Sequence, residues 1–335
     1  MTQSTTSSPG VVARTWRGFV LGVRREPGAL FAYVALAVII FAWVLRTPGL
    51  TITTFTISIG GKLPLVLVAV GMAIVLLSRG IDLSVGYLVA LANVIVVHDA
   101  LWHGNTWLGA IAAVAATALI GLCNGLLVGV LRLPALVVTV ATGAIAWGLA
   151  LYIQPQPGGT VSKGFTNFIM LVMGPVPLAL LLIFLIPLVI WYPISRSRAG
   201  FALRAVGGDE ASAFVSGLST WRSRALAYTL SGTFAGLAGV FVTMTTSAGD
   251  PNGSQSFTLK AIAAAVLGGV ALAGGRGSIV GAVGGGLMLG FITNLLSSWQ
   301  VNSNWQYIVT GALLIAVIGV PYVISQFRAR KATTP

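Results

Sequence analysis

Charged residues and cysteine are scarce in this chain, and their scarcity excludes most soluble architectures. Of the 335 residues, only 7% are charged and 6 are acidic, whereas 56% are hydrophobic and the mean hydropathy is +0.95. A soluble domain typically carries about 25% charged residues, so the composition indicates a polytopic membrane protein. The single cysteine, Cys123, excludes an internal disulfide, and its place inside a hydrophobic run predicts a small packing residue.

Motifs for catalysis and cofactor binding are equally scarce. The sequence has no Gly-x-x-x-x-Gly-Lys-Ser/Thr loop, so the chain cannot bind ATP in the P-loop manner. The 2 histidines, His98 and His103, lie beside Asp99; interfacial polar residues explain them better than a metal site. The net charge of +13 is dispersed over short loops and does not indicate nucleic-acid binding. We therefore expect no enzyme activity, metal site, cofactor or nucleic-acid partner.

Long hydrophobic runs, in contrast, fill the chain and predict an all-α integral membrane fold. Windows of about 20 residues mark about ten membrane-spanning helices, some of them short or broken. With an even number both termini share one side, and fifteen of the 19 basic residues then lie on that side. The positive-inside rule places that side, with both termini, in the cytoplasm. The predicted spans are 29–46, 62–79, 84–101, 108–130, 134–153, 169–193, 223–246, 257–273, 278–297 and 305–326.

The predicted membrane domain covers residues 29–326 and contains one large cytoplasmic loop, residues 194–222. Before it, residues 1–28 place apolar side chains on one helical face and arginines away from that face. This pattern favours an amphipathic helix in the inner membrane interface, although a solvated basic tail would carry the same charges. Residues 327–335 are expected to form a cytoplasmic tail.

Glycine is abundant, with 42 residues, and it recurs at helical spacing in the predicted spans. Gly121, Gly125 and Gly129 are spaced by four, as are Gly232 and Gly236. Small residues at this spacing let helix backbones approach closely. We favour tight packing within one subunit over a subunit interface or a moving helix seam.

The segment Gly80–Gly86 places an aspartate between two hydrophobic runs. It reads Gly-Ile-Asp-Leu-Ser-Val-Gly, so a carboxylate and two glycines interrupt the apolar sequence. A charge facing lipid costs on the order of 3 kcal/mol, and irregular backbone exposed to lipid is excluded. We expect Asp82 either at a membrane surface or where a broken segment lines a protein-enclosed path, and Ser84 to help cap the next helix. The segment favours a protein that moves a solute across a bilayer.

A second candidate site lies in the polar stretch of residues 198–218. Gly207 and Gly208 are expected to break the chain there. Asp209 and the glutamate after it then suit a helix N-terminus, where carboxylates meet free amide groups and the positive end of the dipole. A short helix would follow, ended by Gly217, and it could dock into a cytoplasmic partner or rest on the membrane. We favour docking, through an apolar face formed by Ala211, Phe214, Val215 and Leu218.

These features together resemble the ribose-type permeases of bacterial ABC sugar importers. The resemblance rests on Gly80–Gly86, residues 204–218, residues 228–239 and residues 261–281, which occur in the same order over roughly residues 62–320. The wider family also contains autoinducer, nucleoside and branched-chain amino-acid permeases. The resemblance implies that the loop holds a coupling helix for a separate ATPase subunit. It implicates Gly208, Asp209, Glu210, Ala211 and Gly217, to which the apolar face adds Phe214.

The resemblance also implies the partners and the location. An ABC ATPase subunit would bind the ATP, so this chain would bind no cofactor. A periplasmic or lipid-anchored sugar-binding protein would deliver the solute, and a second permease copy or a homologous permease would complete the path. The expected location is the bacterial inner membrane. The expected solute is a monosaccharide or related polyol, with an autoinducer or a nucleoside as alternatives.

Sparse polar residues within the predicted spans suit a path for such a solute, because they offer hydrogen bonds without a fixed charge. Each could instead form an interhelical hydrogen bond, worth about 0.6 kcal/mol on average in membranes. Ser231 and Thr243 are two further polar residues within the predicted spans to which both interpretations apply. The candidate path residues are Asp82, Ser84, Asn93, Asn124, Thr139, Thr142, Tyr228 and Asn294.

An ion-coupled secondary transporter or channel is the main alternative function. It needs a titratable or ion-coordinating residue at mid-membrane, and Asp82 is the serious candidate. A purely structural membrane subunit fits poorly with the interruption at Gly80–Gly86.

Overall fold

The computed structural model describes residues 27–98, 102–174 and 176–302, together with 304–306, 308–309, 311–313, 315, 316 and 319. The predicted amphipathic helix in residues 1–28, most of the predicted last span at 305–326 and the tail 327–335 lie outside these described residues. The regular elements of the described part are helices and one two-stranded antiparallel hairpin, in which Val172 pairs with Pro177 and Met173 with Val176; an isolated bridge joins Gly158 and Gly249.

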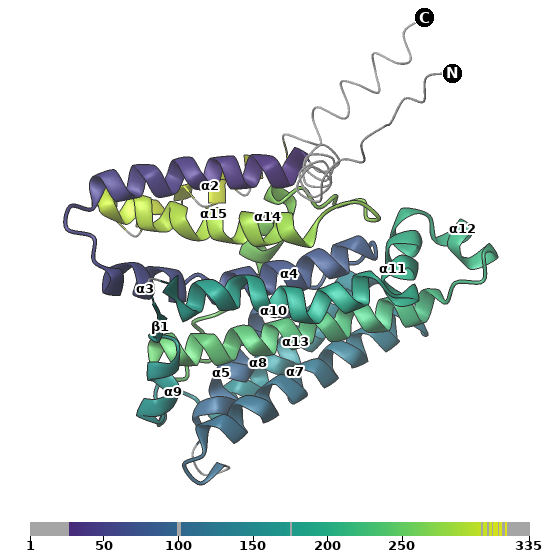
Figure 1. Cartoon of the computed structure of the whole chain (residues 1–335). Helices are drawn as coiled ribbons and strands as arrows, with labels where there is room; N and C mark the ends of the chain where they lie inside the picture. Colours follow the sequence, from purple (N-terminus) through teal and green to yellow (C-terminus); the bar gives the residue numbers. More distant parts are fainter. Residues whose placement is uncertain are drawn as a thin grey trace, which may run out of the picture.

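The elements follow one another along the chain as a series of helices joined by short connections (Figure 1). They are α2 (Pro27–Arg46), α3 (Ile52–Gly60), α4 (Leu63–Leu77), α5 (Val85–Val97), α7 (Thr106–Gly129), α8 (Ala135–Ile153), α9 (Lys163–Phe168), β1 (Val172–Met173), β2 (Val176–Pro177), α10 (Leu178–Ser195), α11 (Arg198–Gly208), α12 (Glu210–Val215), α13 (Thr220–Thr246), α14 (Phe257–Leu267) and α15 (Ile279–Ser298).

α4 and α13 form the centre of the bundle. Every residue of α4 is buried, as expected for a helix that is apolar on all sides. α13 packs against α4, α5 and α7, and α15 packs against α2, α4 and α14. Figure 1 accordingly shows α2 and α15 on one side of α4, and α7 and α8 on the other. α2, α8 and α10 bury fewer than a third of their residues, so they form much of the outer surface of the described part.

Seven helical segments of the described residues are long and apolar enough to cross a membrane. α3 and α4 together make one of them, which begins ten residues before the predicted span at 62–79. The predicted spans at 84–101 and 257–273 are too long, because α5 has 13 residues and α14 has 11. Helices of these lengths extend about 20 and about 17 Å, less than the ~30 Å hydrocarbon core. The start predicted at 169 is wrong as well, because the hairpin occupies the residues before α10.

The four-residue glycine spacing marks the contact between α7 and α13. A Cβ on Gly121 would meet the backbone of Tyr228, and a Cβ on Gly232 would meet the carbonyl of Thr117. Gly125 approaches the backbone of Ala225 in the same way. These glycines therefore pack two helices of one chain, as we favoured.

Cys123 corrects the expectation of a packing residue. It is exposed on the outward face of α7, next to the buried Asn124. Its small size is therefore not required by the packing of the described residues.

Candidate functional site

Asp82 lies at the break between α4 and α5 and is completely buried, with 0% of its surface exposed. The carboxylate accepts three hydrogen bonds from its own chain. The Ser84 amide (3.0 Å) and hydroxyl (2.5 Å) donate to Oδ1, and the Ser231 hydroxyl of α13 donates to Oδ2 (2.7 Å). The protein therefore encloses this carboxylate completely. The aspartate ties the start of α5 to the central helix α13.

Asn124 and Tyr228 extend this buried cluster. Asn124 Nδ2 donates to the Ser84 hydroxyl (3.2 Å), and the Tyr228 hydroxyl donates to the carbonyl oxygen of Ile81 (3.2 Å). Asn124 Oδ1 is buried and has no hydrogen-bond partner in the structure. The expectation that the Ser84 side chain caps α5 is wrong, because its hydroxyl bonds to Asp82 and makes no capping bond. Asp82, Ser84, Asn124 and Tyr228 thus meet at one point of the fold.

Asn93 belongs to a second polar cluster farther along α5. Its Nδ2 donates to the Thr243 hydroxyl (2.7 Å) and to the Ala248 carbonyl (3.0 Å), while its Oδ1 accepts from the Asp250 amide (2.7 Å). Asn93 also lines a pocket of about 370 Å³ that reaches Pro64 and the residues before α14. This amide therefore holds the loop after α13 in place and borders an open space.

The remaining candidate path residues share no hydrogen bond with either cluster among the described residues. Thr139 and Thr142 donate to carbonyl oxygens of their own helix, at 2.9 and 3.0 Å. Asn294 on α15 accepts a hydrogen bond from Lys62 Nζ (2.6 Å), an interaction that the sequence reasoning missed. The two residues are 232 positions apart, so no local pattern indicates this contact.

α12 forms the short helix expected in the large loop. Asp209 is its N-cap: Oδ1 accepts from the amides of Ala211 (3.0 Å) and Ser212 (3.3 Å), and Oδ2 from the Ser212 hydroxyl (2.6 Å). These bonds, led by that of the Ser212 side chain, lower the pKa of the Asp209 carboxyl. Glu210 begins the helix and pairs with Arg224 of α13 at 2.6 Å, the one ion pair found among the described residues. Gly217, with φ +78°, follows the helix end.

Gly207 and Gly208 do not break the chain where we expected. Both belong to the last turn of α11, and the direction changes at Asp209, whose backbone is extended. Gly207 is required by close packing, since a Cβ there would collide with the carbonyl oxygen of Leu77 at the end of α4. The Gly275 amide bonds to that same carbonyl (3.1 Å). α11 therefore abuts both α4 and the loop that connects α14 to α15.

The apolar side chains of α12 project away from the bundle. Phe214 is 66% exposed and Val215 is 86% exposed, whereas Ala213 is buried against the protein. Figure 1 shows α11 and α12 at one end of the helices, beyond α4 and α13. A groove of about 520 Å³ lies beside α12 and is lined by Arg132, Glu210, Ala211, Phe214, Thr220 and Arg224.

Comparison with known proteins identifies the family. The family model described as the branched-chain amino acid transport system / permease component matches residues 60–318. The chain belongs to this permease family. The permease is 34% identical to the D-allose transport system permease protein of Escherichia coli K12 over 263 residues, which are 78% of this chain and 81% of that protein.

Two further relatives have similar sequence identities to the permease. The ribose import permease protein of Escherichia coli K12 is 34% identical over 259 residues, covering 75% of the permease and 80% of the relative. The autoinducer 2 import system permease protein of Enterobacter sp. strain 638 is 35% identical over 301 residues, covering 88% and 85%. No solved structure matches the permease. The permease is a multi-pass membrane protein, because it belongs to this family and has seven helices long and apolar enough to span a membrane among its described residues. The matched residues include both the Asp82 cluster and α12, so both candidate sites lie inside the family region.

Proposed function

We propose that this permease is the membrane-spanning subunit of an ATP-driven ABC importer in the bacterial inner membrane. It would form the path for a monosaccharide or related polyol, and the two relatives named as D-allose and ribose permeases support this class of solute. An autoinducer or nucleoside is the alternative solute within the family. The partners would be an ABC ATPase, an extracytoplasmic sugar-binding protein and a second permease copy or a homologous permease.

The proposed topology has about ten membrane segments, with both termini in the cytoplasm. Residues 1–28 and 327–335 would be cytoplasmic, as would the coupling loop 194–222. The basic residues support this orientation, because the loop that carries α11 and α12 contains Arg196, Arg198 and Arg204. α5 and α14 would enter the membrane only part of the way, covered by the helices around them.

The observation that carries the proposal is the exposed apolar face of α12. A six-residue helix that is capped by its own aspartate and presents Phe214 and Val215 to the outside has the form of an anchor for a partner groove. The permease sequence contains no P-loop, so ATP would be hydrolysed by the subunit into which α12 docks.

Contacts of α11 offer a route from the docked ATPase to the membrane domain. Movement of α12 would displace α11, whose Gly207 touches the end of α4 and the loop between α14 and α15. α4 leads directly to the break at Asp82, and the loop leads to α15. A rigid-body shift at the coupling helix would thus reach both helices without any flexible linker.

The state of Asp82 favours an importer over an ion-coupled carrier. Its two carboxylate oxygens already accept hydrogen bonds from Ser84 and Ser231, and the side chain is completely buried. A coupling ion would have to displace these donors, whereas an uncharged polyol needs no carboxylate partner.

The test is a pull-down of the ATPase subunit with coupling-helix variants. Ala211→Arg and Phe214→Asp should each leave the permease inserted but weaken ATPase binding more than about a hundredfold, because an unpaired charge buried at an interface costs several kcal/mol. Asp209→Asn should have a smaller effect, since asparagine also caps a helix.

Phe201→Asp is the matched control, because Phe201 is 67% exposed but lies on α11. It should keep the ATPase. If Ala211→Arg and Phe214→Asp both retain full ATPase binding, α12 rests on the membrane, and docking must be sought near Arg132 or Arg276.

A further inference from the structure

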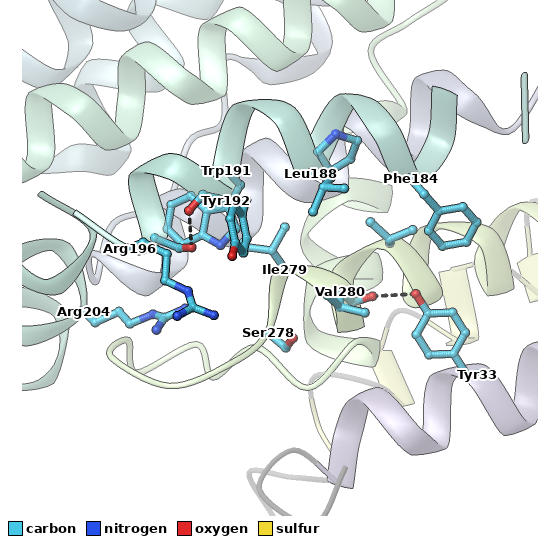
Figure 2. Close-up of a pocket in the computed structure, with 13 residues that line it drawn as sticks. Tyr33, Phe184, Leu188, Trp191, Tyr192, Arg196, Arg204, Ser278, Ile279 and Val280 are labelled. Carbon is cyan, nitrogen blue, oxygen red and sulfur yellow. Dashed lines mark hydrogen bonds between the residues drawn. The ribbon is translucent and has the colours of Figure 1, made fainter. Parts of the chain in front are cut away.

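A groove of about 490 Å³ lies between α2, α10 and α15, away from both candidate sites. Figure 2 shows its two different ends. The side chains of Arg196 and Arg204 lie at one end, and Phe184 and Tyr33 lie at the other. The volume falls within the range of about 300–1,000 Å³ that is usual for ligand pockets.

The polar end is built to hold a negative charge. Arg196 lies over the ring of Tyr192 at 5.3 Å, and Arg204 lies over the ring of Trp191 at 5.9 Å, so the two aromatic faces position both guanidinium groups. Both arginines are exposed, and neither forms an ion pair with any described residue. Two like charges that face one space repel each other unless an anion lies between them.

The first turn of α15 adds to this preference for anions. Ser278, the N-cap of this 20-residue helix, and Ile279 line the groove, and the Ser278 side chain makes no capping bond. Amide groups and the positive end of the dipole at a helix N-terminus favour negative ligands. The polar end of the groove therefore has three sources of positive potential: the two arginine side chains and the N-terminus of α15.

The remainder of the groove is apolar. Phe184, Pro187 and Leu188 line it from α10, and Val280 and Val283 from α15. The Tyr33 hydroxyl donates to the carbonyl of Val280 (2.9 Å), so this polar group is already satisfied and offers no site for a polar ligand (Figure 2). From Tyr192 back to Phe184 the wall follows α10 for about 12 Å. A ligand that fills the groove must combine an anionic group with a hydrocarbon chain.

We propose that this groove binds one anionic phospholipid, with its phosphate between Arg196 and Arg204 and an acyl chain against Leu188 and Val283. The position supports a lipid rather than a soluble anion, because α2 and α10 are among the most exposed apolar helices and would face the bilayer. Basic pockets between membrane helices on the cytoplasmic side are suited to anionic headgroups. The lipid would fasten α10, and with it α11, to the pair formed by α2 and α15.

Lipid binding to the delipidated permease, measured by native mass spectrometry, tests this proposal. Phosphatidylglycerol should bind one molecule per chain, and phosphatidylcholine should bind more weakly. Arg196→Gln and Arg204→Gln should each weaken phosphatidylglycerol binding about fivefold, and the double variant about thirtyfold. Leu188→Trp should reduce binding by filling the apolar part while both arginines remain.

Two matched controls should bind phosphatidylglycerol like the unmodified permease. Arg198→Gln removes a neighbouring arginine that does not line the groove, and Val189→Trp places the same large side chain at the next exposed position of α10. Unchanged phosphatidylglycerol binding by the Arg196/Arg204 double variant would overturn the proposal. Full competition by inorganic phosphate would reduce the site to an anion site without a lipid. The same spectra also report dimers of the permease. If Leu188→Trp abolished a dimer but left phosphatidylglycerol binding unchanged, the groove would be covered by a second copy of the permease and not by a lipid.

Discussion

The hydrogen bonds of Asp82 lead to a prediction that can be tested with two substitutions of nearly the same shape. Asparagine and leucine both branch at Cγ as aspartate does, so neither opens a large cavity. Asp82→Asn keeps an oxygen that can accept from Ser84, and the Ser231 hydroxyl can rotate to accept from the new amide. Asp82→Leu leaves no acceptor for the three donors that now meet the carboxylate.

The cost of Asp82→Leu follows from where those donors can turn. Asn124 Nδ2 now faces the Ser84 hydroxyl, so a flip of the Asn124 amide would let that hydroxyl donate to Oδ1, which is buried without a partner. The Ser231 hydroxyl can turn back to a carbonyl of α13, although with poorer geometry. The Ser84 amide has no substitute, and an unsatisfied buried donor costs about 1–3 kcal/mol. With the lost bonds added, we expect Asp82→Leu to destabilise the protein by about 2–4 kcal/mol and Asp82→Asn by about 1 kcal/mol or less.

The assay is thermal unfolding in detergent, followed by tryptophan fluorescence, together with solute uptake by cells. Asp82→Leu should unfold at a clearly lower temperature and lose uptake, and Asp82→Asn should retain much of both. Ser231→Ala removes one donor and should be intermediate, and it should cost little more when added to Asp82→Leu. Unchanged stability of Asp82→Leu would refute the idea that these bonds hold α5 to α13. A stable, ATPase-competent Asp82→Asn permease without uptake would mean that the charge matters, and ion coupling would have to be reconsidered.

Three further results are expected. Gly232→Ala should destabilise the protein by about 1–3 kcal/mol, because its Cβ would meet the Thr117 carbonyl, whereas Gly148→Ala, which faces open space, should change stability by less than about 0.5 kcal/mol in the same thermal assay. In a Cys123→Ser background, cysteines introduced at the exposed positions Ser162 and Ser256 should react with impermeant thiol reagents in intact cells. A cysteine introduced at Ser212 should react only after the membrane is opened. Labelling of that cysteine in intact cells would contradict the proposed orientation. Glu210→Gln should cost less than about 1 kcal/mol, since its ion pair with Arg224 is partly exposed; a larger loss, unaffected by salt, would mean that this pair fixes α12.

Hydrophobic runs predicted the long helices well. α7, α8, α13 and α15 begin and end within three residues of the predicted spans, because a continuous apolar run of this length has few other stable conformations in a membrane. α12 was predictable too, since two carboxylates before an apolar face specify a short capped helix. Docking of α12 into an ATPase subunit remains a prediction.

Features that depend on tertiary contacts were not predictable. Hydropathy does not report where an apolar segment turns inside the protein, so α5 and α14 were expected to be full spans. The hairpin before α10 was missed for a different reason, since Gly174 and Pro177 are local turn signals that a reading by hydropathy alone does not use. Gly207 was interpreted as a helix breaker, but its small size serves the contact with Leu77. The partner of Asp82, Ser231, lies 149 residues away along the chain, beyond any local pattern.

Reconstitution of the permease in proteoliposomes tests the central claim most directly. The permease would be combined with its ATPase and its sugar-binding protein, and uptake of labelled monosaccharides would be measured with and without ATP. The account predicts uptake that requires ATP and the ATPase and that is lost with Phe214→Asp. Uptake by the permease alone, driven by a proton gradient and unaffected by Phe214→Asp, would contradict it.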